Sequence, residues 1–397
     1  MGNNTSITEH KRHYYRELLC IGVPIIIGQL GTIILGFADT LMIGHHSTEE
    51  LAAAGLVNNI ITFILVSYMG FSYGLTPIIG KLYGMEKTDK IGQKVKNSFF
   101  ANMVVGVIFS LALIILYFNL HRIGQPEELL ALIRPYFIVN LISVLFVGVF
   151  NTLKQFLDGI GNTKVAMWVM IMGNIVNIFG NWVLIYGVGP CPEMGLLGAG
   201  ISTLASRVLM AVAMVGIIAG TKEYREYRNN IIASRINGAD FREMNRLGWP
   251  VALQLALESG AFTLSCVMVG WLGTIPLAAH QVMITISQLF YLVLSGMAAA
   301  LAIRVSHFVG QNDFAAVRRN AYDGWRLNLL FSLCMGIPVL LLRHQIGGWF
   351  NDNVEVQQYV ALLIIMMMLY QFGDGLQYTL ANALRGIACV KPMVTYA

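Results

Sequence analysis

The chain has 397 residues, of which 56% are hydrophobic and only 12% are charged, and its mean hydropathy is +0.65. Soluble domains carry about 25% charged residues, and a single soluble core stops growing near about 250–300 residues. The excess apolar surface must therefore face lipid, which excludes a cytosolic enzyme, a nucleic-acid-binding protein and a secreted disulfide-bonded module. The formal net charge of +5 is ordinary for a membrane protein. The five cysteines form no Cys-X-X-Cys pair, so neither a zinc site nor a disulfide framework is indicated.

Ten apolar stretches are each long enough to cross a bilayer as a helix. The hydrocarbon core is about 30 Å thick and needs about 20 apolar residues of helix. The stretches lack the alternation that is typical of membrane β-strands. They are predicted at residues 18–43, 52–80, 96–119, 131–153, 165–188, 197–219, 248–272, 277–303, 321–343 and 355–384. The fold class is therefore an all-α polytopic membrane protein.

Basic residues alternate between the two sides of this array. The amino-terminal tail, the loops after the second, fourth, sixth and eighth spans and the carboxy-terminal tail are basic, whereas Arg122, Arg134 and Arg343 take the other side. Because positive loops stay in the cytoplasm, we expect a multi-pass protein of the inner cell membrane with a cytoplasmic amino terminus. We expect its partners to be the lipid bilayer and small-molecule substrates, with no nucleic acid, and the chain to be a monomer.

An internal repeat relates the two halves of the chain. At a sequence spacing of 226 the matched segments are Gly22-Val23-Pro24 with Gly248-Trp249-Pro250, Met42-Ile43-Gly44 with Met268-Val269-Gly270, and Leu51-Ala52-Ala53 with Leu277-Ala278-Ala279. At a spacing of 227, Gly159 and Lys164 match Gly386 and Lys391. Each repeat has an even number of spans, so the halves are parallel repeats about an axis along the membrane normal. Such symmetry favours alternating access.

The repeat also predicts the domains. We expect a six-helix first lobe at 1–220, a basic cytoplasmic linker at 221–247 and a second lobe at 248–397. The fifth and sixth spans of the first lobe have no counterpart before residue 397, so the second lobe is expected to lack its last two helices. A truncated product that does not transport is therefore one alternative.

Three carboxylates lie inside predicted spans: Asp39 in the first, Glu258 in the seventh and Asp374 in the tenth. A charge at the bilayer centre costs at least about 2.5–3.5 kcal/mol, so each is a functional hypothesis by default. A carboxylate in a low dielectric can load a proton near neutral pH and release it on hydration. Carboxylates with amide and hydroxyl oxygens can instead hold Na⁺, a hard cation. The alternative is that each acid is a structural hydrogen-bonding group between helices.

Polar neighbours accompany the acids in the second half. Tyr370 lies one helical turn before Asp374, and Gln281 in the eighth span offers an amide. A negatively charged cavity around Glu258 and Asp374 would attract cationic organic substrates. The same carboxylates can serve Na⁺ or H⁺, so the coupling ion stays open.

The fifth span carries a row of asparagines. Asn174, Asn177 and Asn181 lie on one helix face at i, i+3 and i+7, and we expect them to be partners for Asp39. The alternative is that they only hold helices together. Arg207, inside the sixth span, is interpreted as a structural or snorkelling residue.

Several of these segments resemble the multidrug and toxic compound extrusion (MATE) family. The run Phe37-Ala38-Asp39-Thr40-Leu41-Met42-Ile43-Gly44 and then Leu51-Ala52-Ala53-Ala54-Gly55 resembles its first two helices. Similar segments are Leu277-Ala278-Ala279-His280-Gln281-Val282 and Asp158-Gly159-Ile160-Gly161-Asn162-Thr163-Lys164. Glu258, Asp374 and Tyr370 resemble the acid pair and aromatic neighbour of the NorM-type branch.

The resemblance implies a V-shaped fold of two six-helix lobes that exchanges cationic drugs for Na⁺ or H⁺. It implies a second-lobe cation site at Glu258, Asp374 and Tyr370, with Na⁺ possible between the two acids. It implies a first-lobe site at Asp39, Asn174 and Asn177.

Beside the truncated product that does not transport, one further function competes with this antiporter. A flippase for lipid-linked precursors, with the same superfamily architecture, would be expected to show a more cationic cavity, whereas the buried charge here is mainly acidic. An enzyme is not expected, because the sequence shows no nucleophile–base pair and no metal-ligand spacing. No cofactor is expected beyond the coupling ion.

Overall fold

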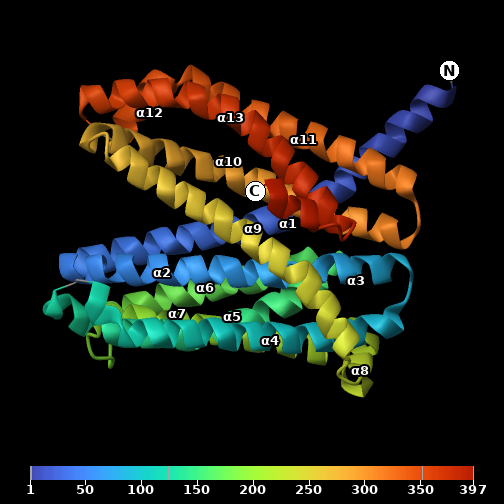
Figure 1. Ribbon diagram of the computed structural model, residues 1–397, viewed down its shortest axis with the longest axis horizontal. Coiled ribbons are helices and arrows are strands. Elements are labelled where there is room, and N and C mark those ends of the chain that lie inside the picture. Colours follow the sequence, from blue (N-terminus) through green and yellow to red (C-terminus); the bar gives the residue numbers. More distant parts are fainter. Residues whose placement is uncertain (1, 124–125, 351, 397) are drawn as a thin grey trace. The chain divides into compact units, whose positions relative to one another are not determined.

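A computed structural model describes residues 2–123, 126–350 and 352–396, in which every regular element is helical (Figure 1). The α-helices are α1 (Gly2–His46), α2 (Thr48–Ser72), α3 (Leu75–Gly84), α4 (Thr88–Phe118), α5 (Glu127–Gly159), α6 (Thr163–Tyr186), α7 (Gly195–Gly220), α8 (Arg225–Ala233), α9 (Gly238–Gly270), α10 (Thr274–Gly310), α11 (Phe314–Leu341), α12 (Arg343–Phe350), α13 (Val354–Gly386) and α14 (Lys391–Tyr396). Two 3₁₀ turns, η1 (Leu120–Ile123) and η2 (Lys222–Tyr224), lie between them.

Ten helical segments of the described chain are long and apolar enough to cross a membrane. They correspond one to one with the ten spans predicted from hydropathy, with α2 and α3 together forming the second, Thr48–Gly84. The all-α polytopic fold class is thereby confirmed. The helices extend past the apolar windows, as α10 does to Gly310, because helix continues from the hydrocarbon into the polar interface.

Local sequence explains where several of these helices begin and end. The side chains of Ser47, Asp313 and Asn353 accept a hydrogen bond from a backbone N–H in the first turn of α2, α11 and α13. These groups would otherwise have no partner within the helix. Helix α6 ends at Gly187, whose φ of 66° is the left-handed conformation that favours glycine.

The chain forms two compact units. The first unit is Ile27–Ala256, and the second unit is Met1–Ile26 with Leu257–Ala397. Helices α1 and α9 each divide between the units, so the beginning of each repeat's first helix packs within the unit of the other repeat. The lobe boundaries at 220 and 248 were predicted by counting six helices for the first repeat, and they stay a prediction.

Glycines make this exchange of helices possible, and they do so equivalently in both repeats. In the second unit, a Cβ on Gly296 of α10 would lie 2.5 Å from Ile26 Cγ1 of α1. In the first unit, a Cβ on Gly70 of α2 would lie 2.8 Å from Ala252 Cα of α9. Gly70 and Gly296, like Ile26 and Ala252, are equivalent at the repeat spacing of 226. The repeat read from the sequence is therefore also a repeat of helix contacts.

The backbone of the turns follows the same register. Glu86 and Asn312, equivalent at the spacing of 226, both have positive φ, at 58° and 59°. Gly161 and Ala388, equivalent at the spacing of 227, have φ of 86° and 59°. A positive φ is uncommon outside glycine, so its recurrence at equivalent positions shows that the two turns have one geometry. The one-residue change of register falls between α4 and α5.

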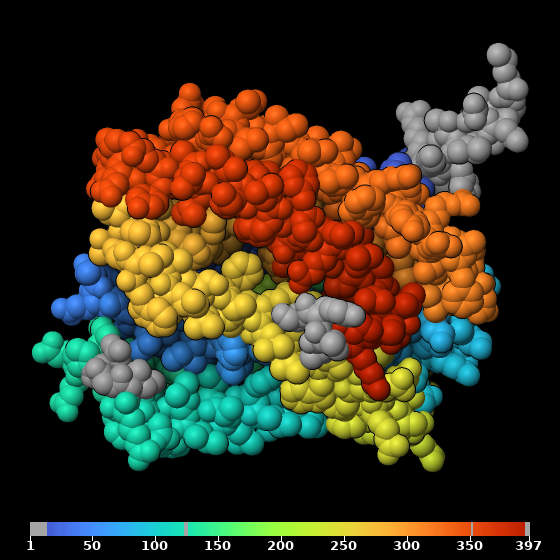
Figure 2. Space-filling model, turned by 45° about the horizontal axis from the view of Figure 1, so that its top comes forward, coloured from blue at the N-terminus to red at the C-terminus, as the bar shows by residue number. Residues whose placement is uncertain are grey.

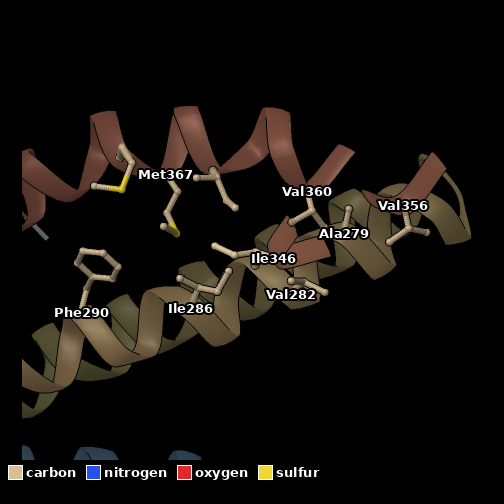
Figure 3. Packing of buried hydrophobic residues seen from close by; sticks show 10 residues of the cluster. Ala279, Val282, Ile286, Phe290, Ile346, Val356, Val360 and Met367 are labelled. Carbon is tan, nitrogen blue, oxygen red and sulfur yellow. The ribbon is translucent and has the colours of Figure 1, made fainter. Parts of the chain in front are cut away.

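An apolar core holds α10, α12 and α13 together in the second unit (Figure 3). Phe290 and Ile286 of α10 face Met367 of α13, and Ile346 of α12 lies in the same cluster. All four are buried. Figure 2 shows the side chains of α11 and α13, in orange and red, packed side by side. This packing fixes α13, which carries Tyr370 and Asp374.

The close approach of α13 to α10 generates the first prediction. A Cβ on Gly386 would lie 2.7 Å from the backbone oxygen of Ala302, whereas a Cβ on Gly216 of α7 meets nothing within 4 Å. We expect Gly386→Ala to destabilise the protein by about 1–3 kcal/mol through overpacking. Gly216→Ala should be neutral or stabilising by up to about 1 kcal/mol through helix propensity. Thermal unfolding in detergent compares the two variants, and equal transition temperatures would contradict this account of the packing.

Candidate functional site

The second unit brings two carboxylates of separate helices together. Glu258 of α9 and Asp374 of α13 lie close enough to interact electrostatically. Gln377 Nε2 donates a hydrogen bond to Glu258 Oε1 at 3.3 Å. Gln377 follows Asp374 by three residues, so the two side chains lie on neighbouring positions of one helix face. Helical spacing from Asp374 was the signal in the sequence that could have identified Gln377.

Aromatic hydroxyls surround this acid pair. The hydroxyl of Tyr370 hydrogen-bonds to Ser287 Oγ of α10, and Tyr370 interacts electrostatically with Asp374. Tyr378, one turn after Asp374, packs edge-on against Tyr291 with ring centroids 5.3 Å apart. Sequence reasoning found Tyr370 but not Ser287, because which side of α10 faces α13 depends on tertiary packing. Tyr378 was also missed, although its helical spacing from Asp374 was a signal for it.

Gln281 occupies a different place from the one its predicted role requires. Its Nε2 donates to Cys266 Sγ at 3.0 Å, near the turn between α9 and α10, and its side chain is exposed. Ser287, which reaches Tyr370, lies six residues further along α10. The structure therefore joins Glu258, Asp374 and Tyr370 in one site and does not bring Gln281 to it.

The acid pair has a definite chemical consequence. Two carboxylates that interact electrostatically disfavour each other's charged form, so a proton or a bound cation stabilises the pair. The pair can therefore take up a proton or hold a cation. The amide and hydroxyl oxygens of the surrounding side chains supply the hard ligands that Na⁺ takes. The same geometry also suits an organic cation.

In the first unit, Asp39 of α1 is held by the asparagine row of α6. Asn181 Nδ2 donates to Asp39 Oδ1 at 2.5 Å. The amide orientation of Asn177 that satisfies its neighbours places its own Nδ2 3.0 Å from Asp39 Oδ1. In that orientation its oxygen accepts from Thr203 Oγ1 of α7 at 3.2 Å. Asn177 and Asn181 therefore both serve Asp39.

Asn174 lies apart from that carboxylate. A Cβ on Gly31 of α1 would be 2.7 Å from Asn174 Nδ2, so this amide faces the α1 backbone two turns before Asp39. Within the described residues its buried Nδ2 has no hydrogen-bond partner. The predicted first-lobe set is thus only partly brought together, and Asn181 takes the direct contact.

Arg207 adds a positive charge to the same unit. Its Nη1 donates to Ser143 Oγ of α5 at 2.5 Å, and it interacts electrostatically with Asp39 and Tyr136. The guanidinium is therefore turned into the unit and does not snorkel to a membrane surface. Within the described residues no ion pair within 4.0 Å joins it to Asp39. The first unit holds a separated pair of opposite charges, whereas the second holds two like charges.

Comparison with known proteins gives consistent matches over the whole chain. The sequence profile of the MatE family matches residues 24–183 and 250–397. The multidrug resistance protein NorM of Photobacterium profundum is 28% identical over 380 residues, which cover 94% of this chain and 82% of that protein.

Solved structures match with similar coverage. A eukaryotic MATE transporter, AtDTX14, superposes with a TM-score of 0.83 at 18% identity, covering 96% of this chain and 84% of that one. A MATE protein in the straight conformation gives 0.84 at 19%, with 96% and 84% covered. A MOP superfamily transporter from Pyrococcus furiosus, described as having a binding pocket of reverse polarity, gives 0.81 at 18%, again with 96% and 84% covered. At these identities the structures share the fold.

The asparagine row generates the second prediction. Asn181→Ala removes a direct donor to the Asp39 carboxylate, and leaving a buried acceptor unsatisfied costs about 1–3 kcal/mol. Asn174→Ala removes an amide whose Nδ2 has no hydrogen-bond partner within the described residues, so its cost should be smaller. Thermal unfolding of the two variants, each also made in an Asp39→Asn background, measures the coupling. The account fails if Asn174→Ala proves the more costly change or if Asn181 shows no coupling to Asp39.

Proposed function

Because this chain belongs to the MatE family of membrane transporters, we propose that it is a secondary active antiporter. It exports cationic organic compounds in exchange for Na⁺ or H⁺ by alternating access. The family match confirms the resemblance drawn from the sequence, and it indicates a transporter rather than an enzyme. The inference that the exported compounds include several drugs rests on the name of the relative, the multidrug resistance protein NorM.

The single observation that carries the proposal is the convergence of Glu258 and Asp374 in one site. A bound cation or proton stabilises this pair of like charges away from water, so the release of one cation favours the binding of another. A substrate cation and a coupling cation that both need these carboxylates bind in turn. Exchange of one for the other is antiport. Tyr370, hydrogen-bonded to Ser287, sets the position of α13 against α10 at this level.

The acids within the spanning helices support a cationic substrate over an anionic one. Asp39, Glu258 and Asp374 all lie in such helices, and Arg207 is the basic residue that interacts electrostatically with Asp39. A flippase for anionic lipid-linked precursors would need the opposite balance. We place the protein in the inner cell membrane as a monomer with its amino terminus in the cytoplasm, because the basic loops alternate sides in that sense.

Neutralising the second-unit acids tests the transport mechanism. We expect Glu258→Gln and Asp374→Asn each to abolish gradient-driven efflux of a fluorescent cation from cells, since neither amide can take up the coupling cation. Glu355→Gln is the matched control, because Glu355 is an exposed acid at the start of α13. Membrane abundance and thermal unfolding are measured alongside. Efflux that survives in both acid variants would contradict the antiport mechanism.

Cysteine labelling tests the orientation independently of transport. Cys191 lies in the loop between α6 and α7, and the exposed Cys389 follows α13. With a cytoplasmic amino terminus, these positions fall on opposite sides after five and ten spans. In single-cysteine variants, a membrane-impermeant maleimide should label Cys191 in intact spheroplasts and Cys389 only after lysis. Labelling of Cys389 in intact spheroplasts would reverse the assignment.

A further inference from the structure

In the first repeat, hydroxyls of α2 and α3 donate to the acceptor oxygens of two buried amides, one in α4 and one in α5, whereas Gln155 Nε2 has no hydrogen-bond partner within the described residues. Ser72 Oγ donates to Asn102 Oδ1 of α4 at 2.6 Å. Thr76 Oγ1 donates to Gln155 Oε1 of α5, also at 2.6 Å. All four side chains are buried. The acceptor oxygens of both amides therefore have protein partners in this repeat.

The second repeat keeps the amides and lacks the hydroxyls. The positions of the two donors are taken by Ala298 and Ala302 of α10, at the spacing of 226. The amides are Asn328 of α11 and Asn382 of α13, at most 9% exposed. Asn328 Oδ1 and Asn382 Oδ1 have no hydrogen-bond partner within the described residues. The loss of each donor explains each orphaned oxygen.

The second repeat also adds polar groups to this interface. Ser332 of α11 stands where the first repeat has Gly106, and Gln371 of α13 stands where it has Val144. Ser332 is 1% exposed and Gln371 is 0% exposed. Within the described part of the chain, Ser332 Oγ and both amide atoms of Gln371 have no hydrogen-bond partner. We call Asn328, Ser332, Gln371 and Asn382 the α11–α13 polar column.

The interface is filled by different side chains in the second repeat. In the first, Tyr68 packs so closely on α5 that a Cβ on Gly148 would overlap its hydroxyl oxygen. The equivalents of these residues are Leu294 and Gly375. A Cβ on Gly375 would meet Ser332 Oγ at 3.5 Å and Leu294 Cδ1 at 3.8 Å, ordinary contact distances. The tyrosine that fills the first interface thus has no counterpart of its size in the second.

The chemistry of the column identifies what it binds. Its orphaned atoms are three amide oxygens that accept, one hydroxyl that both donates and accepts, and one amide nitrogen that donates, and all of them are neutral. A buried polar group without a partner is costly, and native proteins meet that need with ordered water. A cation would leave the donor amide unsatisfied, and the column holds no carboxylate to balance its charge. Water both donates and accepts, so it suits every orphaned atom.

We propose that the α11–α13 polar column binds a file of ordered water molecules that forms a proton path to the acid pair of the second unit. Gln371 lies three residues before Asp374, and Asn382 lies eleven residues beyond Gln371, which is about 16 Å along a helix. The titratable groups that interact electrostatically with Asp374 are Glu258 of α9 and Tyr370 and Tyr378 of α13. The proton path, unlike the bound water, rests on the proposed antiport function.

Hydroxyl-radical footprinting by X-ray pulses tests the water itself and needs no transport. Radicals formed from bound water label adjacent side chains, and Met368 lies within one turn of Gln371 although it is only 7% exposed. Met214 of α7, at 0%, is the control in the other repeat. We expect strong labelling of Met368 and weak labelling of Met214. Equal, weak labelling of the two would overturn the proposal.

Variants that copy the first repeat provide the matched test. Gln371→Val installs the residue that the first repeat has at this position, and Ala298→Ser with Ala302→Thr restores its two donors. Each change should lower the labelling of Met368 severalfold and leave Met214 unchanged. Thermal unfolding verifies that the variants fold. Labelling of Met368 that neither variant changes would overturn the water file.

Proton release tests the path. Addition of a cationic dye to purified protein in weakly buffered detergent should release protons, and Gln371→Val should slow the release severalfold without changing its amount. Release at the wild-type rate in Gln371→Val, or none from the wild type, overturns the proton path. Failure of the proposed function has a different signature, namely that the wild type neither binds nor exports the dye.

Discussion

The structure depends on one constraint, which is that hydrocarbon offers no hydrogen-bond partner. Backbone groups therefore pair within helices, and ten helices of the described chain can cross the membrane. Side chains face the same demand. Ser72 meets Asn102, Thr76 meets Gln155, and Asn181 meets Asp39. Polar groups that break this rule mark the places where an ion, a substrate or water is needed.

The repeat makes such exceptions visible, because each half of the chain serves as a control for the other. Glycine approaches and left-handed turns recur at a fixed spacing, so the scaffold is shared. The acids are not shared. The positions equivalent to Asp39 and Asp374 hold Ser265 and Val147. The two units consequently differ in chemistry, because one places Arg207 within electrostatic range of an acid and the other brings two acids together.

Features that depend on composition along one helix were predictable from the sequence. The ten spans, the register of the repeat and the three acids within the spans all follow from hydropathy, identity at a fixed spacing and the rarity of charge in lipid. Features that depend on how helices rotate against one another were not. Hydropathy does not tell which side of α10 faces α13, so Ser287 was missed. Gln281, chosen for its chemistry, lies beside Cys266. The asparagine face was correctly recognised, but the order of contacts to Asp39 was not.

The exchange of helices between the units was also beyond the sequence. Matching Gly22 with Gly248 shows that the first helices of the repeats are alike, but not that each begins in the unit of the other. That arrangement arises from contacts of Gly70 and Gly296 with residues far away in the chain. Each of α1 and α9 is thereby a covalent link between units, which are the parts that alternating access would move.

The central claim is that the second-unit acids hold either the coupling cation or the substrate. Equilibrium competition tests it most directly, with purified protein and a fluorescent organic cation titrated at fixed pH with Na⁺, and at fixed Na⁺ with acid. The account predicts that one of the two cations raises the apparent dissociation constant of the dye in proportion to its concentration. It predicts that this dependence disappears in Asp374→Asn. Dye affinity that responds to neither cation, or responds equally in the variant, would contradict it.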